Sequence, residues 1–108
     1  MKGTYLGEFE ELVLLAVGIL QDEAYGVSIK AEIEVQTKRG VNIGAVHTAL
    51  HRLEAKSFLK SKFGSATQER GGKRKRLFAL TAKGIKALQT AQELRLQMWA
   101  QIQALQPK

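Results

Sequence analysis

The sequence predicts a mainly α-helical fold with one small β-hairpin, on three observations. Apolar residues recur every three or four positions through the first half of the chain, as they do on the buried faces of short helices. Two segments of β character, at 58–63 and 76–81, then flank a polar stretch that contains Gly71 and Gly72. A single apolar seam at helical spacing follows to the end. With 108 residues, the chain is long enough for one domain with a thin core.

Three helices are expected first. Leu6–Leu20 is hydrophobic almost all round, which predicts burial on more than one side, in part by a second molecule. A short amphipathic helix opens at Tyr25-Gly26 and ends near Thr37, with Gly40 as the residue that terminates it. Asn42 is the candidate N-cap of the third helix. The apolar face of that helix consists of Ile43, Val46, Ala49, Leu50 and Leu53.

The second half of the chain is expected to form a hairpin and one long helix. The strands Phe58–Phe63 and Arg76–Thr81 are joined by a loop from Gly64 to Lys75. Thr81 caps a last helix that runs to about Gln106, before Pro107. Nothing is left in the chain to cover its apolar seam, so it is expected to seek a partner helix. The seam consists of Ile85, Leu88, Ala91, Leu94, Met98, Ile102 and Leu105.

This order of elements is that of a winged helix-turn-helix, with the third helix sized for a DNA major groove. We therefore expect a DNA-binding domain at 1–81 and a C-terminal dimerisation helix at 82–108.

Composition excludes several classes of protein. The absence of cysteine excludes disulfides, thiolate chemistry and Cys-based zinc sites. His47 and His51 have the i, i+4 spacing of helical metal ligands, but the chain has no third histidine. We expect that the protein is not an enzyme and that it has no cofactor and no metal site.

No segment is expected to cross a membrane. The longest apolar run, Leu12–Leu20, has nine residues, whereas a membrane span needs about 20. The acidic residues near the N-terminus do not fit a secretory signal, so a cytoplasmic protein without membrane contact is expected.

The positive charge is concentrated in one segment. Residues 56–76 carry a net charge of +7, which equals that of the whole chain, so the remaining residues sum to zero. Such a concentration is typical of a surface that binds a polyanion. Charge alone leaves open the alternative of a lysine-rich loop in water.

Four segments resemble the PadR family of bacterial transcriptional regulators. They are Leu6–Ala16, Glu23–Val27, Gly44–Glu54 and the basic stretch Glu69–Arg76 with Leu80–Gly84 after it. The resemblance runs in one register from Leu6 to about Leu88. It implies a homodimer that binds an operator and represses transcription. A small molecule or another signal would release this dimer from the operator.

The sequence departs from the family pattern at two places. His47 stands where family members usually have tyrosine, on the exposed face of the third helix, which puts one DNA contact in doubt. The return strand has Leu77-Phe78 where an aromatic pair is usual, a change that a core tolerates.

The candidate DNA-binding residues lie on the third helix and the wing. His47, Thr48 and His51 are placed to reach base edges. The small Gly44 and Ala45 let the helix N-terminus approach phosphate, which Asn42, mainly a cap, can also touch. On the wing, Lys73, Arg74 and Lys75 are expected to contact phosphates, although alternation along a strand points at most half of the basic side chains at DNA. Arg52 is expected to pair with Glu54 or another carboxylate rather than a phosphate.

Trp99 is the candidate ligand contact. In some short-tailed PadR members an aromatic residue on the last helix lines a pore at the dimer interface and stacks on flat ligands. The resemblance therefore implies a small aromatic effector at Trp99, with Phe9 and Val13 of the first helix as walls. The alternative is that Trp99 only packs against the other protomer.

Three other functions remain open at this point. A winged-helix protein-interaction module would lack salt-sensitive binding to duplex DNA. A nonspecific nucleic-acid module would bind all sequences alike, and an RNA-binding module would present exposed aromatic residues, of which the chain has few.

Overall fold

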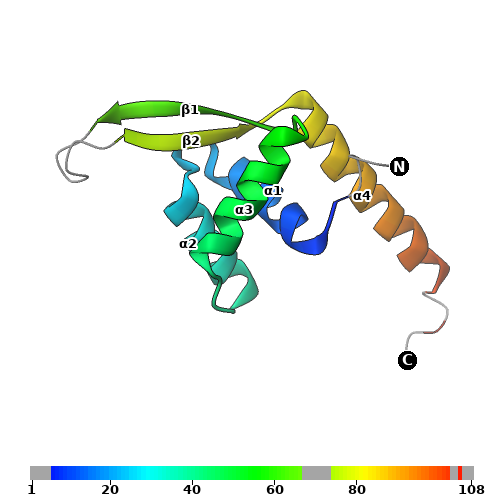
Figure 1. Cartoon of the computed structure of the whole chain (residues 1–108). Helices are drawn as coiled ribbons and strands as arrows, with labels where there is room; N and C mark the ends of the chain where they lie inside the picture. Colours follow the sequence, from blue (N-terminus) through cyan, green and yellow to red (C-terminus); the bar gives the residue numbers. More distant parts are fainter. Residues whose placement is uncertain (1–5, 67–73, 103–104, 106–108) are drawn as a thin grey trace.

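A computed structural model describes residues 6–66, 74–102 and 105 of the chain. Three helices form its centre: α1 (Glu8–Leu20), α2 (Gly26–Thr37) and α3 (Ile43–Ala55). A single 3-10 turn, η1 (Gln21–Glu23), connects α1 to α2. In Figure 1, α3 crosses in front of α1, with α2 at its side.

Side-chain caps start two of the helices as predicted. The Asn42 side-chain oxygen accepts a hydrogen bond from the Ala45 N–H at 3.2 Å, at the start of α3. The Thr81 hydroxyl accepts one from the Gly84 N–H at 3.0 Å. Each cap satisfies a backbone donor that has no partner within the helix. Both sequence-based cap assignments are therefore confirmed.

The prediction that Gly40 ends α2 is wrong. Lys38 takes the left-handed conformation, with φ 60°, and its N–H bonds to the Glu34 carbonyl at 2.8 Å. Gly40 has no positive φ. The helix stops at Thr37, three residues before the glycine, because the Lys38 N–H bonds to the Glu34 carbonyl and the Thr37 hydroxyl to the Ile33 carbonyl.

The hairpin consists of β1 (Leu59–Ala66) and β2 (Arg74–Leu80), paired antiparallel. Leu59 lies opposite Leu80 and Phe63 opposite Arg76, and the register shifts between Phe63 and Ala66. Each strand extends further toward the tip than the sequence predicts, and the tip itself, with the Gly71-Gly72 pair, falls outside the described residues. The hairpin projects well beyond the helices (Figure 1), as a wing does.

One hydrophobic core joins helices and hairpin. Its largest fully buried side chains include Leu14, Ile29, Leu50, Leu53 and Phe58. The Phe78 N–H of β2 donates to the Ala24 carbonyl at 2.8 Å, which fastens the hairpin to the turn before α2. No polar or charged residue is buried in the part of the chain that the structure describes. We call residues 6–81 the head.

The last helix, α4 (Ala82–Gln101), leaves the head and runs away from it (Figure 1); we call it the arm. Ala87 and Leu88 pack against the core, whereas every residue from 92 to 102 is exposed. The arm ends before the predicted Gln106: Ile102 leaves the helical conformation, and its N–H bonds back three residues to Trp99. A mainly helical fold with a wing and a long C-terminal helix is confirmed.

Candidate nucleic-acid interface

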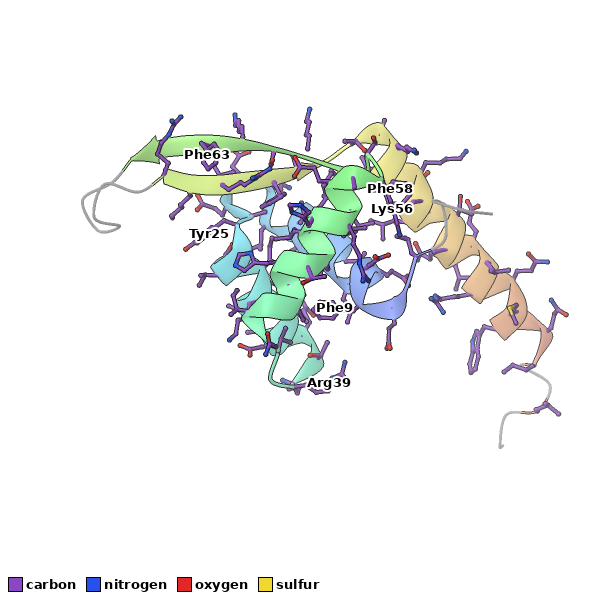
Figure 2. All side chains as sticks on the ribbon, in the orientation of Figure 1. Phe9, Tyr25, Arg39, Lys56, Phe58 and Phe63 are labelled. Carbon is purple, nitrogen blue, oxygen red and sulfur yellow. The ribbon has the colours of Figure 1, made fainter. Side chains whose placement is uncertain are left out.

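The exposed side of α3 is the first component of the site. Val46, Ala49, Leu50 and Leu53 are buried, as their spacing predicts, whereas Ile43, predicted on the same face, is 38% exposed. The opposite side is exposed to solvent along the helix (Figure 2), because neither the hairpin nor the other helices cover it. It contains all six residues singled out on this segment: Asn42, Gly44, Ala45, His47, Thr48 and His51.

His47 is exposed, but its ring lies close to a neighbouring helix. Its ring lies against Gly26, the first residue of α2, where an added Cβ would come within 2.7 Å of the ring carbon Cε1. The absence of a side chain at Gly26 therefore makes room for this ring. This contact joins the start of α2 to the middle of α3.

The expected pair between Arg52 and Glu54 is wrong. Glu54 is half-buried and faces the hairpin, where its two oxygens accept from Arg76 Nη2 at 3.0 Å and from the Ser61 hydroxyl at 2.6 Å. Arg52 is exposed and forms no ion pair with any residue that the structure describes. Its guanidinium is therefore available to a partner outside the chain.

Aromatic rings hold the basic side chains of the wing on two opposite faces. The guanidinium carbons of Arg74 and Arg76 each lie 5.6 Å from the centre of the Phe63 ring. Lys75, between them, turns the other way, and its Nζ lies 4.3 Å from the centre of the Tyr25 ring. These are cation–π distances. Figure 2 labels both rings; Lys73 falls outside the described residues.

The turn between α2 and α3 adds two exposed cations, Lys38 and Arg39, which the sequence analysis did not single out. Its conformation is held by Glu34, which accepts from the Val41 N–H at 2.9 Å and from Lys30 Nζ at 3.1 Å. The Val41 N–H first, and then Lys30, lower the pKa of the Glu34 carboxyl from its ordinary value. This carboxylate therefore links the end of α2 to the approach of α3.

Residues 14–90 match the model of the transcriptional regulator PadR-like family. The chain belongs to this family. Membership agrees with the winged helix-turn-helix geometry, and it makes the protein a DNA-binding transcriptional regulator rather than an enzyme, as the sequence analysis expects.

Several solved structures are similar to the structure of this chain. A transcriptional regulator from Clostridium thermocellum is 26% identical, with a TM-score of 0.66 over 84% of this chain and 86% of the other. A complex structure of hsRosR-S1 is 26% identical, with a TM-score of 0.73 over 91% and 80%. A PadR-like transcription factor from Bacteroides fragilis, 21% identical, matches with a TM-score of 0.73 over 91% and 89%. None of the curated proteins matches this chain.

The described residues of this PadR-like regulator contain no cluster of three or more side chains able to hold a metal ion. Among the same residues, no helix has the length and apolar character needed to cross a membrane.

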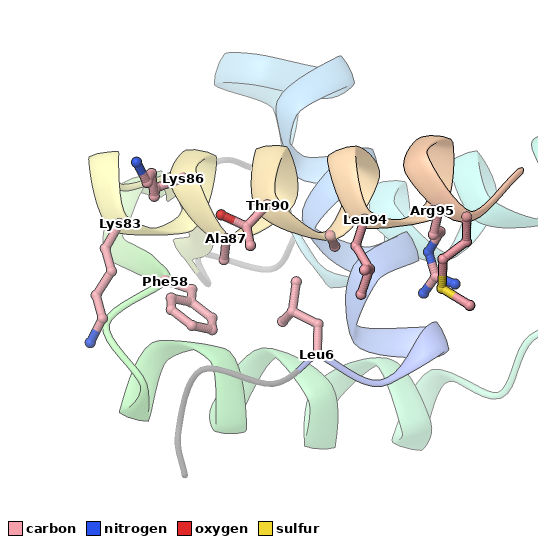
Figure 3. A pocket seen from close by; sticks show the side chains of 10 residues that line it. Leu6, Phe58, Lys83, Lys86, Ala87, Thr90, Leu94 and Arg95 are labelled. Atoms are coloured by element: carbon pink, nitrogen blue, oxygen red, sulfur yellow. The ribbon is translucent and has the colours of Figure 1, made fainter. Parts of the chain in front are cut away.

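The three ligand candidates lie in different surroundings. Trp99 is 46% exposed on the arm, Phe9 is half-buried on α1, and Val13 is fully buried in the core, so its side chain does not reach the surface of the single chain. None of them lines the groove of about 870 Å³ between the arm and the head (Figure 3). The lining of that groove includes Leu6, Phe58, Leu94, Lys83, Lys86 and Arg95.

Proposed function

We propose that this PadR-like regulator is a homodimeric repressor that acts in the cytoplasm on a pseudo-palindromic operator and is released by a small molecule or another signal. The observation that supports this most strongly is the exposed side of α3, which adjoins a basic wing and is covered by no other described part of the chain. A helix with one buried and one bare polar side is what a major groove requires.

On α3, we assign base reading to His47, Thr48 and His51. Their side chains can donate to and accept from base edges in the major groove. Gly44 and Ala45 carry little side chain, which lets the first turn approach the sugar-phosphate backbone and present its N–H groups to a phosphate next to the Asn42 cap. Arg52, exposed at the other end of the helix, is a further phosphate contact.

On the wing, we assign phosphate binding to Lys73, Arg74 and Lys75. The rings of Phe63 and Tyr25 limit the motion of Arg74 and Lys75, so less side-chain freedom is lost when these cations meet a phosphate. This contribution depends on salt and not on sequence.

A second copy of the chain is the partner that we assign to the arm. The arm exposes large apolar side chains at Ile85, Leu94, Leu96, Met98 and Trp99, and Ile102 and Leu105 beyond its end are exposed too. Leu15 and Ile19 of α1 are also exposed. Exposed apolar surface on this scale marks an interaction site. In the proposed division, residues 1–81 read DNA and residues 82–108 dimerise. The two α3 helices then enter major grooves about one turn, or about 34 Å, apart.

For release, we propose a flat aromatic effector that stacks on Trp99 at the dimer interface. Phe9 forms a wall, and the buried Val13, one turn further along α1, supports it. Titrating planar aromatic compounds against the fluorescence of this single tryptophan tests the site. Saturable quenching supports a bound effector, and its absence supports a purely structural Trp99.

Selection from a random duplex pool, followed by sequencing, tests the whole proposal. A symmetric enriched motif is the expected result and gives the operator directly. Salt-sensitive retention of every duplex without a motif would point instead to a nonspecific nucleic-acid module. Little retention at low salt would favour a winged-helix protein-interaction module.

A further inference from the structure

The arm is joined to the head first at its base. The Thr81 hydroxyl donates to the Ser57 carbonyl at 2.7 Å, and the Thr81 N–H donates to the Phe58 carbonyl at 3.2 Å. One turn later, Gly84 lies so close to the Phe58 carbonyl that an added Cβ would overlap the carbonyl oxygen. This end of the arm is a tight backbone-to-backbone junction.

The second junction is a single ion pair further along. Arg95 Nη2 donates to Glu11 Oε1 of α1 at 2.9 Å. Arg95 lies eleven positions beyond Gly84, which is about 16 Å along the arm. Between the two junctions, the groove separates the arm from Leu6 and Phe58 (Figure 3). The ion pair therefore spans an opening instead of adding to a packed surface.

The two partners differ in their freedom. The Glu11 side chain is only 17% exposed, whereas that of Arg95 is 62% exposed. The carboxylate is thus a fixed point on the head, and the arginine is the movable end that reaches it from the arm. All described arm residues beyond this region are exposed, so Arg95 makes the last polar contact between arm and head that the structure describes.

We propose that Glu11 and Arg95 are positioning residues that set the angle between arm and head, and thereby the half-site spacing that the dimer accepts. This inference rests on the proposed function, because the arms must join two heads for the angle to matter. A rotation of about 10° over an arm about 30 Å long displaces its far end by about 5 Å. Successive base pairs are about 3.4 Å apart, so this small change of angle exceeds one step of DNA.

Because the Arg95 side chain is mostly exposed, the ion pair contributes little to overall stability, and its removal is expected to leave the fold intact. Its effect is on geometry. Without Arg95 at Glu11, the arm is held at its base and where Ala87 and Leu88 pack against the core, and the part beyond them can tilt across the groove. A dimer whose heads tilt binds operators of several half-site spacings. Its affinity for each of them is lower than the affinity of the rigid dimer for the one spacing that it prefers.

The test uses full-length protein and a series of duplexes whose half-sites are moved together or apart by one or two base pairs. Wild type is expected to prefer one spacing. Arg95→Gln and Glu11→Gln are each expected to reduce that preference by about tenfold, or about 1.4 kcal/mol. The exchange variant Glu11→Arg/Arg95→Glu is expected to restore the preference for one spacing.

The control is Lys56→Gln, which removes the 3.0 Å pair with the neighbouring Glu10 inside the head and is expected to keep the spacing preference of wild type. An unchanged spacing profile in both single variants would overturn the proposal.

A distance measurement separates this inference from the proposed function. The chain has no cysteine, so Ala55→Cys on α3 and Ala100→Cys on the arm place two spin labels on one chain, diluted with unlabelled protein. Arg95→Gln is expected to broaden the head-to-arm distance distribution, and Lys56→Gln to leave it unchanged. If wild type binds no duplex, the proposed function fails while this distance still reports the angle. If Arg95→Gln leaves the distance distribution as narrow as in wild type, Arg95 does not hold the arm.

Discussion

Two glycines lie close to neighbouring groups, and the kind of neighbour decides what an added methyl group does. At Gly26 the neighbour is the end of the His47 ring, which can rotate away. We expect Gly26→Ala to change the free energy of unfolding by no more than about 0.5 kcal/mol. Turning the ring away is expected to weaken operator binding, measured by fluorescence anisotropy. In a His47→Ala background the same change should no longer affect binding; a persisting effect would contradict the assignment.

At Gly84 the neighbour is the Phe58 backbone carbonyl, which has no rotamer to change. Gly84→Ala is therefore expected to destabilise the protein by about 1–3 kcal/mol through overpacking. Denaturant unfolding measures the change. Gly7→Ala serves as the control, because a Cβ at Gly7 meets nothing within 4 Å, and it should cost only a fraction of that amount.

The link between α2 and α3 makes stability depend on pH. Folding lowers the pKa of the Glu34 carboxyl from its ordinary value, mainly through the Val41 N–H and secondly through Lys30. A lowered pKa means that the ionised carboxylate stabilises the fold above its unfolded pKa, and that this contribution is lost as pH falls through the folded pKa. Glu34→Gln is thus expected to be less stable than wild type at neutral pH.

The same argument predicts that the difference between Glu34→Gln and wild type shrinks as the solution is acidified below the ordinary carboxyl range. Thermal unfolding across a pH series measures it. Lys30→Gln should have a smaller effect than Glu34→Gln, because the Val41 hydrogen bond remains. A stability difference that is independent of pH would show that the Glu34 carboxylate does not hold this turn.

The ends of elements could be predicted where their signals are local. Asn42 and Thr81 cap helices by bonding to a backbone N–H three residues on, so the short polar side chain before an apolar run was enough. Gly40 misled because Lys38 adopts the left-handed conformation without being glycine. The strands were predicted too short because pairing joins backbone groups, and the polar residues near the tip gave no β signal.

The site could be predicted only in part for a similar reason. The exposed side of α3 could be predicted, because apolar residues that recur every three or four positions mark the buried side of a helix and leave the other side to solvent. The partners of Glu54, Lys75 and Arg95 come from distant segments: Arg95 and Glu11 are 84 positions apart. Sequence proximity favoured Arg52 for Glu54, whereas the fold brings Arg76 to it. Such pairs depend on the packing of helices against the hairpin, which a single sequence does not encode as a pattern.

For the molecule as a whole, the wing is expected to supply the salt-dependent part of DNA binding. Each phosphate contact adds about −0.9 to the slope of log K against log salt concentration. Lys73→Ala/Lys75→Ala is therefore expected to flatten the slope by up to about two units. Lys83→Ala/Lys86→Ala, on the arm, removes the same charge and should leave the slope nearly unchanged. Equal slopes for wild type and the wing variant would exclude the wing as a phosphate contact.

In the proposed homodimer the arm links the two heads, so its apolar face should control both assembly and affinity. Leu94 and Met98 are 55% and 60% exposed in the single chain. Leu94→Asp/Met98→Asp is expected to give a monomer in analytical ultracentrifugation. That monomer should bind one half-site as wild type does but lose about 10²–10⁴-fold in affinity for the full operator, because the second head is no longer held nearby.

The control is Gln92→Asp, which adds charge to the arm without removing apolar surface and should remain dimeric. A dimeric Leu94→Asp/Met98→Asp variant would place the main interface elsewhere, with the exposed Leu15 and Ile19 of α1 as the next surface to change.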